Sequence, residues 1–199
     1  MWDLSPEATT HTAVVDDVEL FDRQAHLQRE ARDVVEQLRL VEILGRAGRV
    51  VPLGSAVTGL MVWRDLDFGV DGSGLGSDAA WETLRPLLGR CSALRYLYDT
   101  DDRRHYFVLR LDDWKIDISL WSAGMPPGVE AFQTDLIAHL TDPLRVTILR
   151  LKEAWCPLAT YPEIVSAWQI YDAVLHHDVR TLAELDDYLA ARGLPTREG

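Results

Sequence analysis

The chain has 199 residues, 47% of them hydrophobic, which is enough for the core of one domain or of a small α+β unit with a helical appendage. Its formal net charge of −12 argues against a long nucleic-acid footprint, which needs clustered Lys and Arg, and is compatible with a small, cationic substrate. Solubility alone explains this acidity equally well. Two distant cysteines, no signal peptide and no membrane-length apolar run predict a cytoplasmic protein that does not enter a membrane.

The first part of the chain predicts one long helix followed by alternating short elements. Residues 1–16 form a polar N-terminal segment, and apolar side chains recur with helical spacing through 17–46. A short strand that runs into a turn is expected over 49–55, and a short helix over 55–63. The next strand is expected over 64–70.

The middle of the chain predicts a helix and then successive strands. A loop rich in Gly and Ser leads to a helix that Ser77 or Asp78 could cap and that ends near Leu88. Three strands with alternating character follow, over 92–100, 101–111 and 112–121.

Beyond Pro127 the pattern changes to helices. Four helical stretches are expected, over 129–140, 142–155, 161–177 and 181–193. The predicted fold class is therefore α+β, with a mixed β-sheet core flanked by helices and a helical C-terminal part. The predicted division is a polar segment over 1–16, an α/β core over 17–126 and a helical region over 127–199.

Two aspartates in the strand over 64–70 are candidate metal ligands. Side chains alternate along a strand, so Asp65 and Asp67 share one face while Leu66 and Phe68 share the other. Neighbouring carboxylates repel, and a divalent cation relieves that repulsion. Magnesium is held by one or two protein carboxylates together with substrate phosphates, which suits this pair. Alone, the pair is better explained as solvated charges on an exposed edge strand.

A third candidate carboxylate lies in the strand over 112–121. Asp117 stands between Ile116 and Ile118, and a carboxylate in an apolar strand is costly unless it is paired or binds a metal. If the two strands are neighbours, Asp117 completes a cluster of three carboxylates. A salt bridge to Lys115 or Arg110 is the alternative explanation.

The turn at Gly54 and Ser55 is a candidate phosphate site. It ends one predicted strand and opens a helix, so glycine allows close backbone approach and the serine hydroxyl and free N–H groups are available. For Ser55 an N-cap role is also expected and is compatible with phosphate binding.

Together these residues resemble the nucleotidyltransferase superfamily, whose fold is shared with DNA polymerase beta. The resemblance rests on three ordered pieces between about residues 50 and 121: the turn "LGS", the triplet "DLD" in "DLDF", and the later "IDI". The short chain with a helical C-terminal part is similar to the small bacterial members, such as aminoglycoside, lincosamide and minimal nucleotidyltransferases. The bulky spacer "LMVW" departs from the polar or glycine-rich spacer that is common in the family.

The resemblance implies roles for single residues. Gly54 and Ser55 would hold the triphosphate of an NTP, such as ATP, and Asp65 and Asp67 would bind Mg²⁺. Asp117 would be a further ligand or the general base. The expected reaction is transfer of a nucleoside monophosphate to a hydroxyl of a small-molecule acceptor, with pyrophosphate leaving and nucleic acid not expected as a partner.

Two basic residues are weaker candidates for the triphosphate. Arg64 directly precedes the acidic pair, and Lys152 lies in a helical stretch, where small members often use a basic residue. A surface position is the alternative for both. Two further interpretations of the whole chain stay open: a catalytically inactive member that binds a nucleotide or a partner, and a glycosyltransferase whose metal site is the Asp-x-Asp pair.

Overall fold

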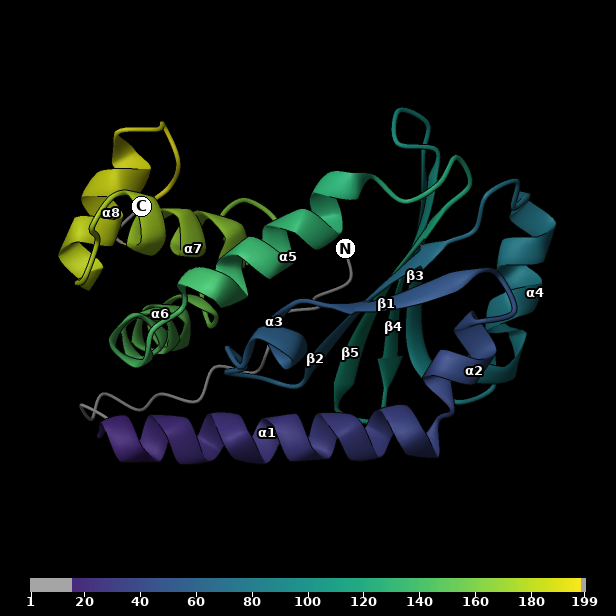
Figure 1. Cartoon of the computed structure of the whole chain (residues 1–199), viewed down its shortest axis with the longest axis horizontal. Coiled ribbons are helices and arrows are strands. Elements are labelled where there is room, and N and C mark those ends of the chain that lie inside the picture. Colours follow the sequence, from purple (N-terminus) through teal and green to yellow (C-terminus); the bar gives the residue numbers. More distant parts are fainter. Residues whose placement is uncertain (1–15, 198–199) are drawn as a thin grey trace. The chain divides into compact units, whose positions relative to one another are not determined.

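The computed structural model describes residues 16–197 of the chain (Figure 1). Within this part, residues 26–135 form one compact unit, and residues 16–25 with 136–197 form a second. We call them the sheet unit and the helical unit. Their limits do not coincide with the predicted limits at 16/17 and 126/127, and that division stays a prediction. The predicted polar segment 1–16 lies outside the described residues except for Asp16.

The sheet unit is built on one mixed sheet of five strands in the order β1-β2-β5-β4-β3. Strand β2 runs parallel to β5, and the other neighbouring pairs are antiparallel. The strands are β1 (Arg49–Leu53), β2 (Asp65–Asp71), β3 (Cys91–Asp99), β4 (Arg104–Leu111) and β5 (Trp114–Trp121). The helices of this unit are the second part of α1 (Asp17–Gln37), α2 (Leu40–Leu44), α3 (Ser55–Thr58), α4 (Ser77–Leu88) and the start of α5 (Pro127–His139). The α+β fold class predicted from the sequence is confirmed.

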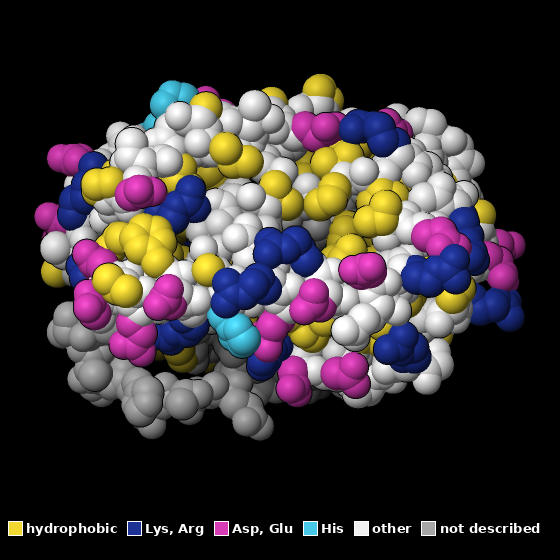
Figure 2. Space-filling model, turned by 60° about the horizontal axis from the view of Figure 1, so that its bottom comes forward, with side chains coloured by type: hydrophobic (Ala, Val, Ile, Leu, Met, Phe, Trp, Pro, Cys, Tyr) yellow, Lys and Arg dark blue, Asp and Glu magenta, His cyan; other side chains and the backbone are white. Residues whose placement is uncertain are grey.

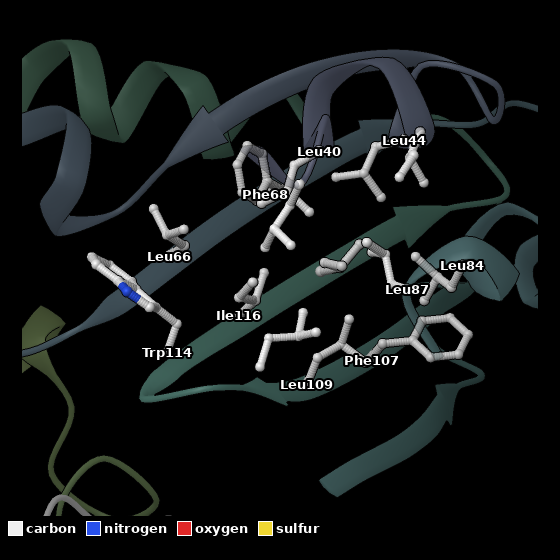
Figure 3. Packing of buried hydrophobic residues seen from close by; sticks show 14 of the residues in the cluster. Leu40, Leu44, Leu66, Phe68, Leu84, Leu87, Phe107, Leu109, Trp114 and Ile116 are labelled. Carbon is white, nitrogen blue, oxygen red and sulfur yellow. The ribbon is translucent and has the colours of Figure 1, made fainter. Parts of the chain in front are cut away.

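One face of the sheet is packed with apolar side chains. Phe68, Phe107, Leu109, Ile116 and others lie between the strands and the helices α1, α2 and α4 (Figure 3). Because side chains alternate along each strand, the same strands turn their remaining residues to the opposite face. We call the first face the helical face and the second the carboxylate face.

Three helices begin or end elsewhere than their sequence pattern predicts. The expected helix over 17–46 is interrupted at Arg39, which has a left-handed backbone (φ 53°), so that α2 is separate. The helix expected over 55–63 is only the four residues of α3, because Gly59 ends it in a left-handed conformation (φ 70°). Helix α7 begins at Ala167 rather than near 161, where Ser166 forms a capping box.

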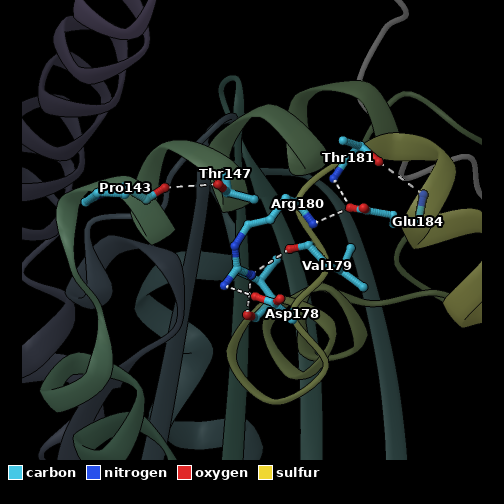
Figure 4. Close-up of polar contacts among 8 residues, drawn as sticks. Pro143, Thr147, Asp178, Val179, Arg180, Thr181 and Glu184 are labelled. Atoms are coloured by element: carbon cyan, nitrogen blue, oxygen red, sulfur yellow. Dashed lines mark hydrogen bonds and ion pairs between the residues drawn. The ribbon is translucent and has the colours of Figure 1, made fainter.

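The helical unit contains α6 (Asp142–Trp155), α7 (Ala167–His176) and α8 (Leu182–Ala190) beside the start of α1 and the end of α5. Thr181 caps α8: its hydroxyl accepts from the Glu184 N–H, and the Glu184 carboxylate accepts from the Thr181 N–H at 2.8 Å (Figure 4). Arg180 donates to the carbonyls of Val174 and Val179, which fixes the turn before α8. Across residues 16–197, no helix is long and apolar enough to cross a membrane.

Candidate active site

The parallel pairing of β2 with β5 brings the predicted carboxylates together. Asp67 lies opposite Asp117, and Asp65 lies opposite Lys115, so these four side chains occupy adjacent positions on the carboxylate face. The apolar neighbours Leu66, Ile116 and Ile118 are buried on the helical face. This alternation is what presents charged side chains at the centre of a sheet.

The turn between β1 and α3 lies directly against Asp67. Gly54 has a φ of 71° and a ψ of −157°, a conformation open almost only to glycine. A Cβ atom placed on Gly54 would be 1.9 Å from Asp67 Oδ2. Position 54 therefore requires glycine for two reasons: its backbone angles, and the close contact with the Asp67 carboxylate. The turn therefore lies against one member of the acidic pair, and the shared role that the resemblance implies for them stays a prediction.

The expected contribution of a helix N-terminus at this turn is small. Helix α3 has four residues, and its Val57 and Thr58 N–H groups bond back to the Gly54 carbonyl at 3.2 Å. The Thr58 hydroxyl also donates to that carbonyl. Ser55 is buried at 5% exposure. A phosphate at this turn would therefore depend on the turn itself rather than on a long helix dipole.

Lys115 is the residue that sequence reasoning placed only as a possible partner of Asp117. Its ammonium lies 2.7 Å from Asp117 Oδ2 and 3.3 Å from Asp65 Oδ1, so it joins two strands. The Lys115 residue is 4% exposed. Its parity with Asp117 in β5 was visible in the sequence, but its contact with Asp65 requires the pairing of β5 with β2.

The charges around Lys115 and Tyr106 fix their protonation. Burial by itself lowers the pKa of Lys115, but the carboxylates of Asp65, Asp117 and Asp67 raise it more, so the ammonium keeps its proton. The Tyr106 hydroxyl donates to Asp117 Oδ2 at 2.8 Å. Burial and the negative charge of Asp117 both hold the pKa of Tyr106 above its usual range. Both groups are therefore hydrogen-bond donors to Asp117 at neutral pH.

The bulky spacer between the turn and the acidic pair packs inward. Leu60 and Met61 are buried, at 0% and 1% exposure. The Trp63 ring lies 5.4 Å from the Lys115 ammonium and 5.9 Å from the Arg110 guanidinium, within the range of cation–π attraction. The spacer thus forms one wall around Lys115, and the departure from the family pattern has a structural role.

The two weaker basic candidates are each engaged elsewhere. Arg64 forms a two-pronged ion pair with Glu30 of α1, at 3.1 and 3.0 Å. Lys152 is 1% exposed in the helical unit and donates to the Tyr171 hydroxyl at 3.3 Å. Their roles at a triphosphate stay predictions. The contacts with Glu30 and Tyr171 are an alternative explanation of why a basic residue stands at each position.

The carboxylates fit a metal ion in pairs rather than as a set of three. Within residues 16–197, no group of three or more His, Cys, Asp or Glu side chains is placed to share one ion. Asp117 Oδ2 already accepts from Lys115 and Tyr106, whereas Asp117 Oδ1 is shielded from solvent and has no hydrogen-bond partner in the described part of the chain. Asp65, whose Oδ1 accepts from Lys115 at 3.3 Å, and Asp67, beside the Gly54 turn, are the pair that could hold Mg²⁺ together with phosphate oxygens. The predicted cluster of three is present in register but not as a ready ligand set.

Arginines continue the carboxylate face across β4 and β3. Arg110 lies opposite Lys115, and Arg95 lies opposite Val108. Arg104 and Arg95 stand over the Tyr106 ring, at 5.2 and 6.0 Å. This arginine row places positive charges beside the carboxylates, although Arg104 is itself ion-paired with Asp99 at 3.3 Å.

A cavity of about 450 Å³ lies behind the turn, on the helical face. Its lining includes the apolar Leu53, Ala56, Val57, Leu66 and Phe68, and it also includes Asp67. Figure 2, seen with α1 toward the reader, shows a hollow among hydrophobic side chains with charged groups around it. We do not assign the triphosphate to this cavity, because its walls are mainly apolar.

Solved structures of similar fold support the architecture. The chain has a TM-score of 0.56 to the Cid1 poly(U) polymerase with Mg and 3′-dATP bound, at 19% identity over 81% of this chain and 54% of that one. For a cytoplasmic RNA terminal U-transferase the TM-score is 0.53, at 18% identity over 81% and 55%. For the polymerase core of TRAMP, an RNA surveillance complex, it is 0.55, at 13% identity over 89% and 64%.

These likenesses show the fold. The chain has the nucleotidyltransferase, polymerase-beta-like fold that its sequence resembles, and it spans about half the length of the first two structures. No protein-family model and no curated protein matches the sequence.

Proposed function

We propose that this chain is a Mg²⁺-dependent nucleotidyltransferase, which transfers a nucleoside monophosphate from an NTP such as ATP to a hydroxyl group. The observation that carries the proposal is the junction of the Gly54 turn with Asp67, opposite Asp117. A glycine turn in contact with a carboxylate pair is what a magnesium triphosphate needs. Cid1 structures with Mg and 3′-dATP, MgATP or MgGTP bound support the choice of ligand. The cytoplasmic location predicted from the sequence is part of this proposal.

Each residue has a separate task in the proposed reaction. Gly54 and Ser55 would position the phosphates, and Asp65 and Asp67 would hold the ion. Mg²⁺, when bound, would neutralise charge that develops on the phosphates. The acceptor oxygen would attack the α-phosphorus as the bond to pyrophosphate breaks, and the acceptor proton would pass to a base, for which Asp117 is a candidate.

The acceptor has two candidate classes. The net charge of −12 favours a small-molecule hydroxyl, especially on a cationic compound. The arginine row, together with the aromatic rings of Tyr106 and Trp63, favours an anionic acceptor such as the 3′ end of a short RNA. The RNA terminal uridylyl transferase activity of Cid1 and the membership of the TRAMP polymerase core in an RNA surveillance complex support the second class.

The test is an assay with α-labelled NTPs, Mg²⁺, and a panel of small hydroxyl compounds and short single-stranded RNAs. We expect labelled product and pyrophosphate, and a loss of about a thousandfold in Asp65→Asn/Asp67→Asn, since a bound ion stabilises the transition state by several kcal/mol. The matched control is Asp71→Asn, on the same strand and face, which should change the rate by no more than about twofold.

An inactive, nucleotide-binding protein is the second candidate. The engagement of Asp117 by Lys115 and Tyr106 favours it, because a base or ligand that is already paired is less available. Mg²⁺-dependent NTP binding that is lost in Asp65→Asn/Asp67→Asn, with no transfer to any acceptor, would select this candidate. Binding that the double substitution leaves unchanged would overturn both.

A further inference from the structure

Lys115 is a buried cation that lies among the carboxylates of the candidate site. Its ammonium bridges Asp65 of β2 and Asp117 of β5, at 3.3 and 2.7 Å. The Lys115 residue is 4% exposed, and Trp63 covers it from one side. A buried ammonium between two carboxylates neutralises charge that water does not screen.

The formal charges of the cluster suit one divalent ion. Asp65, Asp67 and Asp117 carry three negative charges and Lys115 carries one positive charge, which leaves two negative charges. A single Mg²⁺ balances that remainder. A second ion that bound Asp117 Oδ2 would have to displace Lys115 and Tyr106 from that atom, and the other oxygen, Asp117 Oδ1, is shielded from solvent.

We propose that Lys115 is a resident cation of the site, so that the carboxylates bind one divalent ion, at Asp65 and Asp67, rather than two. In this arrangement Asp117 anchors Lys115 and is held by Tyr106, so it is a positioning residue rather than the base for which it is a candidate above. The inference rests on the proposed function, because it concerns the ion that the proposed reaction needs.

The first experiment counts bound ions. The full chain, saturated with an NTP analogue that has a methylene group between the α and β phosphorus atoms, is titrated with Mn²⁺ and read by electron paramagnetic resonance. We expect one tightly bound Mn²⁺ per chain. Two bound ions would overturn the inference and leave the proposed function standing. No bound Mn²⁺ with the nucleotide would overturn the proposed function itself.

The second experiment removes the charge and keeps the size of the side chain. In Lys115→Met we expect a second Mn²⁺ to bind, or the first to bind at least about tenfold more tightly, because an ammonium no longer repels it. Without metal the melting temperature should fall by about 5 °C or more, since the carboxylates then lose the ammonium that lies between them. Added Mn²⁺ should restore more of that loss than it adds to the wild type.

Two further variants serve as controls for this result. Arg110→Met removes a cation that lies opposite Lys115 and also contacts Trp63, and it should leave one Mn²⁺ per chain. Lys115→Arg keeps the charge and should also bind one ion, even if Lys115→Met does not fold. An unchanged ion count and affinity in a folded Lys115→Met protein, or two ions in Lys115→Arg, would overturn the inference.

Discussion

The two faces of the sheet are made from the same strands and have opposite chemistry. On the helical face, Leu66, Phe68, Ile116 and Ile118 are at most 3% exposed and belong to the apolar core. On the carboxylate face, one position away along each strand, Lys115 and its partner carboxylates form a charged cluster.

The difference shows how one sheet both holds the fold and presents a site. The helical face stabilises the chain through the burial of apolar area, which has no directional requirement. The carboxylate face stabilises little, because its favourable ion pairs are set against the cost of desolvating charges. The free energy gained by apolar burial on the helical face therefore allows the carboxylate face to hold charged groups in positions that do not favour folding.

The largest expected effect is on the helical face. Phe68→Ala should lower the free energy of unfolding by about 3–5 kcal/mol, because it leaves a cavity among side chains that cannot close around it. Asp67→Asn, the next residue, should change it by less than about 1 kcal/mol while it weakens Mg²⁺-dependent nucleotide binding. Urea unfolding and nucleotide titration of both variants measure the contrast. Equal losses of stability would contradict the division between the faces.

A smaller loss of stability is expected from a substitution at Gly54, in the turn beside Asp67. Gly54→Ala should cost about 1–3 kcal/mol of stability from backbone strain, and should also displace the Asp67 carboxylate and reduce nucleotide binding. Gly74→Ala is the matched control, because Gly74 also has a positive φ, of 82°, but a Cβ there would touch nothing within 4 Å. Nucleotide binding measured by calorimetry should fall only in Gly54→Ala. A similar fall in both would mean that strain, not contact with Asp67, is the cause.

The smallest expected effect on stability comes from His105, a titratable residue on the helical face. Burial lowers the pKa of His105, although a backbone hydrogen bond with Leu75 works in the opposite direction, and the ring lies 3.0 Å from the Tyr96 hydroxyl. As the pH falls, His105 is therefore protonated first in the unfolded chain. The stability that neutral His105 contributes is present above about pH 6.5 and is lost as the pH falls below it.

A series of thermal unfolding curves between pH 7.5 and 5.5 checks this expectation. His105→Gln, which cannot titrate, should have a flatter dependence of melting temperature on pH than the wild type. Identical slopes would show that His105 does not contribute.

Much of the sheet unit was predictable because its information is local. Alternation alone placed Asp65 and Asp67 on one face and Leu66 and Phe68 on the other. The glycine at position 54, followed by serine, predicted the turn, and the order of the three motifs predicted the superfamily fold.

Other features were not predictable because they depend on partners distant in sequence. Arg39 adopts a left-handed backbone that its residue type does not favour, and so the long predicted helix breaks before α2. The spacer "LMVW" departs from the family pattern, and only the fold places its Trp63 beside Lys115 and Arg110.

The sequence by itself determined which side chains lie on which face of each strand, because the period of two is a property of the backbone. The tertiary structure decided which strands are neighbours, and therefore that Asp117 lies opposite Asp67 and that Lys115 reaches Asp65. Strand pairing depends on the whole sheet, since a crossover of more than forty residues separates β2 from β5. The sequence therefore named the carboxylates, and only the pairing of β2 with β5 revealed the cation among them.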